Sequence, residues 1–245
     1  MESILDWGLE VIIWLQRFSP TLDLPFKAIT FMGDQPFFML LLPLVYWCLN
    51  RRAGARLTIL FLFSAYINTV AKILAAQPRP YQYDPQVLQL HKAGGGGFPS
   101  GHTQNGVVVW GYLASQFSRV GPWILAGLLM LLIPLSRLYL GVHFPTDLLG
   151  GYLLGGVLLL LYLWLEPRVE AWLTTKGLAG QLCAGILVPL LLVLLVPSAG
   201  KYGVITAATL MGMGVGFALE RRWVRFESEA IWWKQVLRFL IGVPV

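Results

Sequence analysis

Two histidines and one aspartate have side chains and spacings that suit nucleophilic and acid–base chemistry. Asp147 follows His143 by four residues, so its carboxylate is close enough to accept the ring N–H of that histidine and to orient it, as in other catalytic triads. His102 supplies a second imidazole. We expect one histidine to act as a nucleophile and the other as an acid, and the residues alone leave open which does which.

Three cations accompany these residues, namely Lys72, Arg79 and Arg137. Arginine offers a planar fork that matches phosphate oxygens, and lysine offers a point charge. Ser100 is placed to cap a helix whose free N–H groups bind anions. Together, the three cations and this helix start predict a phosphate site. Cations and N–H groups placed around a phosphate stabilise the extra negative charge of a phosphoryl-transfer transition state.

A zinc site is an alternative use of the same side chains. His102, His143 and either Asp147 or Asp84 offer ligand atoms that zinc accepts. The three cations would repel the metal, so we expect no metal and no other cofactor. The third histidine, His91, stands in a long loop, where we expect it to be solvated.

The composition excludes most soluble proteins. The chain has 245 residues, of which 57% are hydrophobic and 12% are charged, whereas a soluble domain has about 25% charged residues. An intrinsically disordered chain is also excluded, because disorder needs few hydrophobic residues and many charged ones. The formal net charge of +6 does not indicate nucleic acid, because Lys and Arg mark the cytoplasmic loops of membrane proteins. Cys48 and Cys183 lie in apolar surroundings and predict neither a disulfide framework nor a thiolate metal site.

Seven apolar segments approach the roughly 20 residues that a membrane-spanning helix needs. They are residues 36–50, 55–76, 101–118, 122–140, 147–165, 180–197 and 202–219. We therefore predict an all-α, polytopic transmembrane helical bundle. It has about six core helices, extra C-terminal spans and interfacial amphipathic helices. In the fifth segment, small residues predict a close approach of helices, namely Gly150, Gly151, Gly155 and Gly156.

The two ends of the chain are expected to lie on the bilayer surface. Residues 3–18 have an amphipathic pattern, with an additional tilted span as the alternative. Residues 24–33 are expected at the boundary or in a re-entrant segment, and Asp34 begins the next helix. We therefore divide the chain into three regions: a surface and boundary region, a core bundle, and C-terminal spans with a basic tail. Their bounds are 1–33, 34–166 and 167–245.

The placement of Lys and Arg predicts the orientation of the chain. Eleven of them lie in residues 50–56, 119–121, 166–179 and the C-terminal tail, and three lie in residues 77–100, 140–146 and 198–201. We expect the first loops in the cytoplasm and the second loops on the opposite side. All the polar residues named above then converge at one depth on the non-cytoplasmic side. Polar residues that merely pack or snorkel would scatter in depth, so the convergence indicates a single site.

The chain resembles the type-2 phosphatidic acid phosphatase family of integral membrane lipid phosphatases. Three motifs carry the resemblance, over about residues 36–165. They are Lys72 with Arg79-Pro80, then Pro99-Ser100-Gly101-His102, and then Ser136-Arg137 with His143 and Asp147. All are complete and in order.

The resemblance implies a role for each motif residue. His143 would attack the phosphorus and form a phosphohistidine, and Asp147 would orient it. His102 would protonate the leaving oxygen and then activate water. The phosphate oxygens would be held by Lys72, Arg79, Ser100, the backbone N–H of Gly101, and Arg137. No metal is required.

The expected function is hydrolysis of a lipid phosphate or pyrophosphate on the non-cytoplasmic face. Bacterial relatives suggest undecaprenyl pyrophosphate, phosphatidylglycerophosphate or phosphatidic acid as the substrate, in a bacterial inner membrane with the site facing the periplasm. The expected partners are this lipid and the bilayer, with no nucleic acid. Two alternatives remain: a phosphotransferase that uses the same site, and a lipid-binding or transport protein without turnover.

Overall fold

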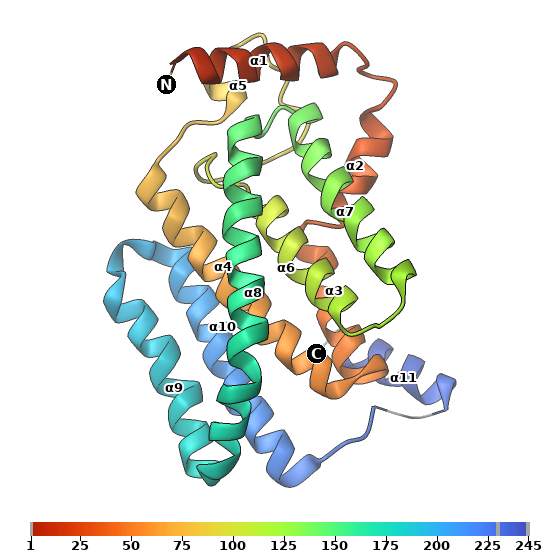
Figure 1. Cartoon of the computed structure of the whole chain (residues 1–245), viewed down its shortest axis with the longest axis vertical. Coiled ribbons are helices and arrows are strands. Elements are labelled where there is room, and N and C mark those ends of the chain that lie inside the picture. Colours follow the sequence, from red (N-terminus) through yellow and green to blue (C-terminus); the bar gives the residue numbers. More distant parts are fainter. Residues whose placement is uncertain (1, 229–230, 244–245) are drawn as a thin grey trace. The chain divides into compact units, whose positions relative to one another are not determined.

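The described part of the chain is predominantly helical, as predicted (Figure 1). The computed structural model describes residues 2–228 and 231–243, and these residues contain no strand. The helices are α1 (Glu2–Gln16), α2 (Asp23–Phe31), α3 (Gln35–Pro43), α4 (Arg51–Ala75), α5 (Pro80–Tyr83), α6 (Gly101–Ser115), α7 (Val120–Tyr139), α8 (Pro145–Thr175), α9 (Gly177–Leu195), α10 (Gly200–Leu219) and α11 (Trp232–Gly242). π-helical turns at Leu44–Leu49 and Glu220–Val224 extend α3 and α10.

Five described segments are long and apolar enough to cross a membrane, and a sixth is added if the broken pair of α2 and α3 counts as one span. The five are Arg51–Tyr83, Val120–Tyr139, Pro145–Thr175, Gly177–Leu195 and Pro197–Val224. The protein is therefore a multi-pass membrane protein. A break before residue 36 was expected, since residues 24–33 were placed at the boundary or in a re-entrant segment.

The predicted span at residues 101–118 forms a shorter helix than expected. Its α6 has 15 residues, which extend about 22 Å, whereas the hydrocarbon core is about 30 Å thick. Polar residues set both limits, because Ser100 caps the start and Gln116 follows the last helical residue. Most of α6 is buried in protein, including Val108 and Tyr112, so it does not need the length of a lipid-facing helix.

The chain divides into two compact units, and each is assembled from separated stretches of sequence. Unit 1 contains residues 1–34 and 67–159, and unit 2 contains residues 35–66 and 160–245. The long helices α4 and α8 each contribute to both units. All the residues predicted to form the phosphate site lie in unit 1.

Helix α1 packs on the loops of unit 1. Leu9 and Ile12 form a buried cluster with Val87 and Phe144. The Gln16 side chain donates from Nε2 to two backbone carbonyls, those of Leu88 at 2.8 Å and Tyr139 at 3.0 Å. Its Oε1 also accepts from the Leu88 N–H at 2.9 Å. One side chain thus connects α1 to the loop at Leu88 and to the last residue of α7.

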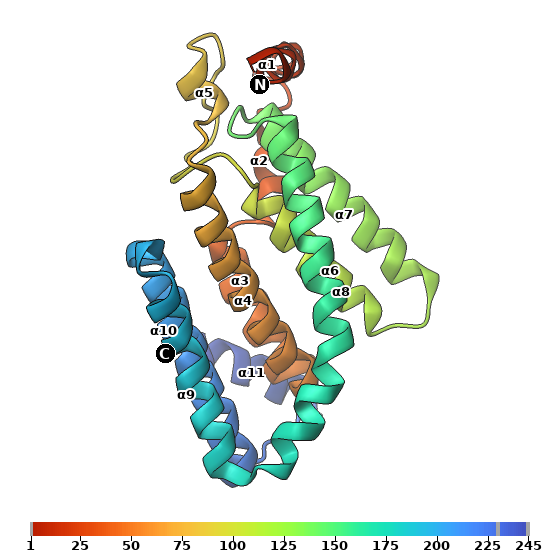
Figure 2. The same ribbon diagram turned by 60° about the vertical axis from the view of Figure 1, so that its left-hand side comes forward.

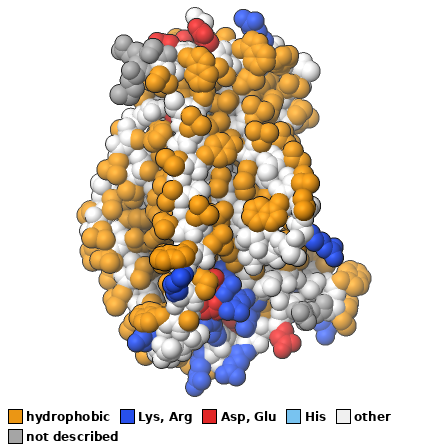
Figure 3. Space-filling model, in the orientation of Figure 1, with side chains coloured by type: hydrophobic (Ala, Val, Ile, Leu, Met, Phe, Trp, Pro, Cys, Tyr) orange, Lys and Arg blue, Asp and Glu red, His pale blue; other side chains and the backbone are white. Residues whose placement is uncertain are grey.

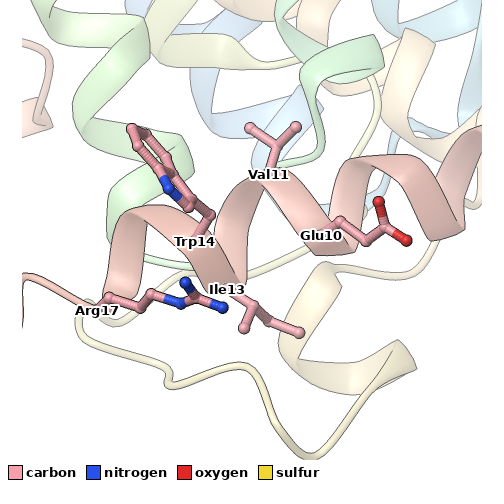
Figure 4. A pocket seen from close by; sticks show the side chains of 5 residues that line it. All are labelled: Glu10, Val11, Ile13, Trp14 and Arg17. Atoms are coloured by element: carbon pink, nitrogen blue, oxygen red, sulfur yellow. The ribbon is translucent and has the colours of Figure 1, made fainter.

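The outer face of α1 carries exposed apolar side chains, including Ile4, Trp7 and Trp14, and Phe18 is exposed just after the helix. This exposure supports the prediction of an interfacial helix. Figure 4 shows an open hollow along the helix, whose lining side chains all belong to α1 or to the residue just after it. They are Glu10, Val11, Ile13, Trp14 and Arg17. None of them belongs to the predicted phosphate site.

Glycines bring α8 close to α6 within unit 1. A Cβ atom on Gly151 would lie 2.7 Å from the Ser100 carbonyl oxygen, and one on Gly155 would lie 2.8 Å from the Gln104 carbonyl oxygen. Such approaches exclude any side chain, so the predicted packing role of these two glycines is confirmed. The start of α8 is thereby held against the start of α6.

Unit 2 is held together by ion pairs and by close helix packing. Arg56 pairs with Glu166 at 2.6 Å and also with Glu170, while Arg52 pairs with Glu170 at 2.8 Å. Figures 1 and 2 show α9 and α10 side by side. Figure 3 shows that most side chains on the visible face are hydrophobic, with Lys and Arg side chains among them. The exposed cations of unit 2 include Arg52, Arg168, Lys176, Arg221 and Arg222.

The contact between α9 and α10 predicts a selective loss of stability. A Cβ on Gly214 would lie 3.1 Å from the Gly185 Cα, whereas a Cβ on Gly212 has no atom within 4 Å. We expect Gly214→Val to lower the free energy of unfolding by about 1–3 kcal/mol through overpacking. Gly212→Val, on the same helix, is the control. Thermal unfolding in detergent should show a lower midpoint for Gly214→Val, and equal midpoints would contradict this packing.

Candidate active site

The site is built around the start of α6. Ser100 is fully buried, and its side chain accepts the Thr103 N–H at 3.4 Å, which confirms the predicted helix cap. The Ser100 N–H donates to the Asp147 carbonyl at 2.9 Å. Gly101 begins the helix, and a Cβ there would lie 2.9 Å from Asn68 Oδ1. The first turn of α6 is therefore fixed against α8 and α4, and a helix N-terminus of this kind has free N–H groups that suit an anion.

His143 and Asp147 form a buried pair, with Nδ1 and Oδ2 3.0 Å apart. Asp147 lies in the first turn of α8, and His143 lies in the loop that precedes this helix. The same carboxylate accepts the Phe144 N–H at 2.9 Å and the Gln77 side-chain N–H at 2.7 Å. With both oxygens engaged, the carboxylate has a fixed direction. Gln77 was not predicted, because it belongs to none of the motifs.

The second ring nitrogen of His143 faces Arg79. The distance from Arg79 Nη1 to His143 Nε2 is 3.3 Å. A guanidinium only donates hydrogen bonds, so the lone pair of Nε2 accepts from Arg79, and Nδ1 carries the hydrogen towards Asp147. Burial, together with the nearby positive charge of Lys72, lowers the pKa of His143 well below its ordinary value. This histidine is therefore neutral at neutral pH, as a nucleophile must be.

Lys72 and Arg79 are wrapped by the run of four glycines at residues 94–97. Lys72 Nζ donates to the Gly96 and Gly97 carbonyls at 2.8 and 3.2 Å. Arg79 donates to the Gly94 and Gly95 carbonyls at 2.6 and 3.1 Å. The four carbonyl oxygens compensate for the burial of two cations. The sequence shows this run plainly, but not that its carbonyls turn inward.

Two of these glycines occupy positions that other residues would disrupt. Gly95 has a φ of +68°, in the left-handed region that favours glycine. A Cβ on Gly97 would lie 2.9 Å from the Pro78 carbonyl oxygen and 3.2 Å from Asp147 Oδ2. The glycine run therefore allows the loop to approach both the cations and the carboxylate.

Arg137 lies in the last turn of α7 and is 2% exposed. Its Nη1 donates to Thr30 Oγ1 at 2.5 Å and lies 3.4 Å from His91 Nδ1. Its Nε is buried and has no hydrogen-bond partner in the part of the chain that the structure describes. A buried cationic N–H without a partner is costly, so this atom is a natural donor to the oxygen of an anion.

His102 lies in the first turn of α6 and contacts Asp34, which was predicted only as a helix start. Helix α3 does begin at Gln35, but the Asp34 carboxylate turns to His102 and lies 3.0 Å from its Nε2. His91 is also different from its prediction. It is partly buried rather than solvated, and its Nε2 lies 3.5 Å from Asp34 Oδ2. The loop that carries His91 folds inward, because the Leu90 N–H donates to the Leu140 carbonyl at 3.2 Å.

These side chains surround a pocket of about 240 Å³. It is lined by Asp34, Lys72, Arg79, His91, Lys92, Ala93, Gly94, Gly101, His102, Arg137 and His143. Ser100 and Asp147 are fully buried. The structure thus brings every residue of the predicted set to one place. Among the described residues, no three or more His, Cys, Asp or Glu side chains are arranged to hold a metal ion.

Two family models match the chain. The model of the PAP2 superfamily matches residues 53–170. A second model, described as "PAP2 superfamily phosphatase, transmembrane extension", matches residues 204–245. The first match contains all three motifs, and the second covers most of α10 together with the C-terminal tail.

Known relatives align over much of the chain. Lipid phosphate phosphatase delta of Arabidopsis thaliana is 26% identical over 241 residues, which cover 91% of this chain and 58% of that protein. Phosphatidylglycerophosphatase B of Bacillus subtilis is 29% identical over 165 residues, with coverage of 62% and 79%. The mouse glucose-6-phosphatase 3 is 30% identical over 180 residues and is covered to 52%. The chain spans little more than half the length of the Arabidopsis and mouse proteins.

Two solved structures share the fold. The crystal structure of a transmembrane PAP2-type phosphatidylglycerolphosphate phosphatase from Bacillus subtilis gives a TM-score of 0.58 at 24% identity, covering 69% of this chain and 89% of that one. Aquifex aeolicus LpxE gives a TM-score of 0.56 at 25% identity, with coverage of 63% and 93%.

Proposed function

Since this chain belongs to the PAP2 superfamily, we propose that it hydrolyses the phosphomonoester or pyrophosphate group of a membrane lipid. One observation carries the proposal. A neutral, oriented histidine opens onto a pocket that it shares with three buried or half-buried cations and a second histidine. A pocket that only bound phosphate would not need the pair formed by His143 and Asp147.

In the first step, His143 Nε2 attacks the phosphorus. A P–N bond forms, and the bond from phosphorus to the lipid oxygen breaks. His102 gives a proton to that leaving oxygen. Asp147 accepts the Nδ1–H and stabilises the positive charge that the ring acquires. The lipid alcohol, or the lipid monophosphate if the substrate is a pyrophosphate, then departs.

In the second step, His102 takes a proton from a water molecule that attacks the phosphorus. The P–N bond breaks, its electron pair returns to Nε2 of His143, and inorganic phosphate is released. The oxygens of the phosphoryl group are held throughout by Lys72, Arg79, Ser100, the Gly101 N–H and Arg137. Arg137 contributes an N–H that has no partner among the described residues in the free protein. These donors stabilise the charge of both transition states without a metal.

A lipid substrate suits the surroundings of the site. Leu149 and Leu153 lie on α8 just after Asp147 and are 68% and 72% exposed. An acyl or polyprenyl tail could extend along such a surface in the bilayer while its phosphate reaches the pocket. The relatives named above include phosphatases for lipid phosphates and for a sugar phosphate. Their names therefore do not identify the substrate of this chain, and an assay is needed.

We also propose that the site faces the non-cytoplasmic side, in a bacterial inner membrane. Helix α4 supports this orientation, because Arg51, Arg52 and Arg56 lie at its start and Lys72 lies near its end. Helix α8 repeats the pattern, with Asp147 in its first turn and Lys176 directly after its last residue. In both helices the end near the site is the less basic one.

The substrate class is tested by a phosphate-release panel. The purified protein should release phosphate from at least one of phosphatidic acid, phosphatidylglycerophosphate and undecaprenyl pyrophosphate. The rate should be unchanged by a chelator, because the pocket stabilises phosphate charge with its own cations. Sphingoid phosphates extend the panel. Release from none of these lipids would refute the proposal, and a newly phosphorylated lipid in place of free phosphate would identify a phosphotransferase.

The nucleophile is tested by His143→Ala. This variant should form no phosphoenzyme and should lose at least about 10³-fold in kcat, because the imidazole nitrogen that attacks the phosphorus is absent. His102→Ala is the comparison, and it should still form phosphoenzyme from an aryl phosphate, whose leaving group needs no proton, but should hydrolyse it slowly. Trapping and mass analysis detect the intermediate. A phosphoenzyme in His143→Ala, or fast turnover in His102→Ala, would contradict these roles.

The orientation is tested by single cysteines in a background that lacks Cys48 and Cys183. Gln89 is exposed in the loop beside the site, and Lys176 is exposed between α8 and α9. We expect a membrane-impermeant maleimide to label Gln89→Cys in intact cells, but Lys176→Cys only after permeabilisation. The reverse pattern would show that the site faces the cytoplasm.

A further inference from the structure

The pocket contains a second histidine–aspartate pair that none of the motifs includes. His102 Nε2 and Asp34 Oδ1 are 3.0 Å apart, the same distance as in the pair of His143 and Asp147. The two pairs arise differently. His143 and Asp147 are four residues apart in the chain, whereas Asp34 comes from the turn between α2 and α3 and meets His102 at the start of α6.

The charges around His102 make this carboxylate important. The groups that face the pocket from α4, α7 and the loops are almost all cationic or imidazole side chains, namely Lys72, Arg79, His91, Lys92, Arg137 and His143. Among the described residues that line the pocket, Asp34 is the one carboxylate. A nearby positive charge disfavours an imidazolium, and a nearby carboxylate favours it. An acid must hold its proton when the reaction starts.

The carboxylate of Asp34 is itself held in place. His91 Nδ1 lies 3.4 Å from Arg137 Nη1, and since the guanidinium donates, Nδ1 accepts and Nε2 carries the hydrogen. That Nε2 lies 3.5 Å from Asp34 Oδ2. Gly33 allows the turn to come this close, because a Cβ there would lie 2.6 Å from His102 Cδ2. Both oxygens of Asp34 therefore face an imidazole.

We propose that Asp34 is the positioning residue of His102: its carboxylate orients the ring and favours the protonated form, from which a proton passes to the leaving oxygen. This inference rests on the proposed function. Asp34 stays ionised throughout, and the proton that reaches the leaving oxygen comes from His102. In the second step, the carboxylate stabilises the imidazolium that forms when His102 takes a proton from water. Asp34 thus does for the acid what Asp147 does for the nucleophile.

The test compares Asp34→Asn with the wild-type protein on two substrates. An alkyl lipid phosphate has a poor leaving group that needs a proton, whereas p-nitrophenyl phosphate does not. For the lipid we expect kcat/KM to fall about 10²-fold, within the range that acid–base catalysis contributes. For the aryl phosphate we expect kcat/KM to change by less than about threefold, because this parameter reports phosphoenzyme formation, which needs no proton for such a leaving group. Slower hydrolysis of the phosphoenzyme would lower kcat alone. Asp6→Asn, which removes an exposed carboxylate on α1, is the control and should match the wild type.

The pH dependence gives a readout that a merely structural role would not move. Loss of the carboxylate makes His102 release its proton more readily. The alkaline limb of kcat/KM for the lipid should therefore move to lower pH in Asp34→Asn. Equal losses on both substrates with an unmoved limb would overturn the proposal.

A spectroscopic measurement separates this inference from the proposed function. The chain has three histidines, so selective ¹⁵N-histidine labelling gives a spectrum that single histidine variants can assign. The titration midpoint of the His102 signals should lie at lower pH in Asp34→Asn than in the wild type. An unchanged midpoint would overturn the inference even in an active enzyme. If the midpoint is lower in Asp34→Asn but the wild-type protein releases no phosphate, the proposed function is refuted and the pairing of His102 with Asp34 remains supported.

Discussion

Mutual repulsion among Lys72, Arg79 and Arg137 is the constraint to which the rest of the site responds. Removing a cation from water costs several kcal/mol even after relaxation, and like charges in a shared pocket add to that cost. The protein compensates for two of them with four carbonyl oxygens from residues 94–97. The negative charge of a bound phosphate would reduce the repulsion that remains among the three cations. This gain would add to the binding free energy of the phosphate.

The same field of positive charge acts on the two histidines. It favours the neutral form of His143, which suits a nucleophile, and by itself it would also deprotonate His102. Each histidine also contacts one carboxylate. Asp147 contacts Nδ1 of His143, so that Nε2 faces Arg79 and the pocket, whereas Asp34 contacts Nε2 of His102. In our proposal, the different roles of the two imidazoles follow from where each carboxylate lies relative to the cations.

Short-range patterns in the sequence carried most of this arrangement. The cap at Ser100 and the close packing of Gly151 and Gly155 depend on local chemistry, and both were predictable. So was the pairing of His143 with Asp147, because one turn separates them. The contact between Asp34 and His102 was not, since it joins distant segments through the direction of one side chain. The length of α6 was overestimated for a related reason: hydropathy does not distinguish burial in protein from burial in lipid.

Many of the contacts that hold the outer loops end on main-chain atoms. Gln16 binds the backbone of Leu88 and Tyr139, and Lys72 and Arg79 bind carbonyls of the glycine run. Every residue type except proline presents the same backbone groups. The exposed side chains of residues 86, 88 and 89, in the loop that leads to His91, could therefore change over evolutionary time without loosening the loop. Sequence change would then proceed in this loop, while the residues of the pocket stay constant.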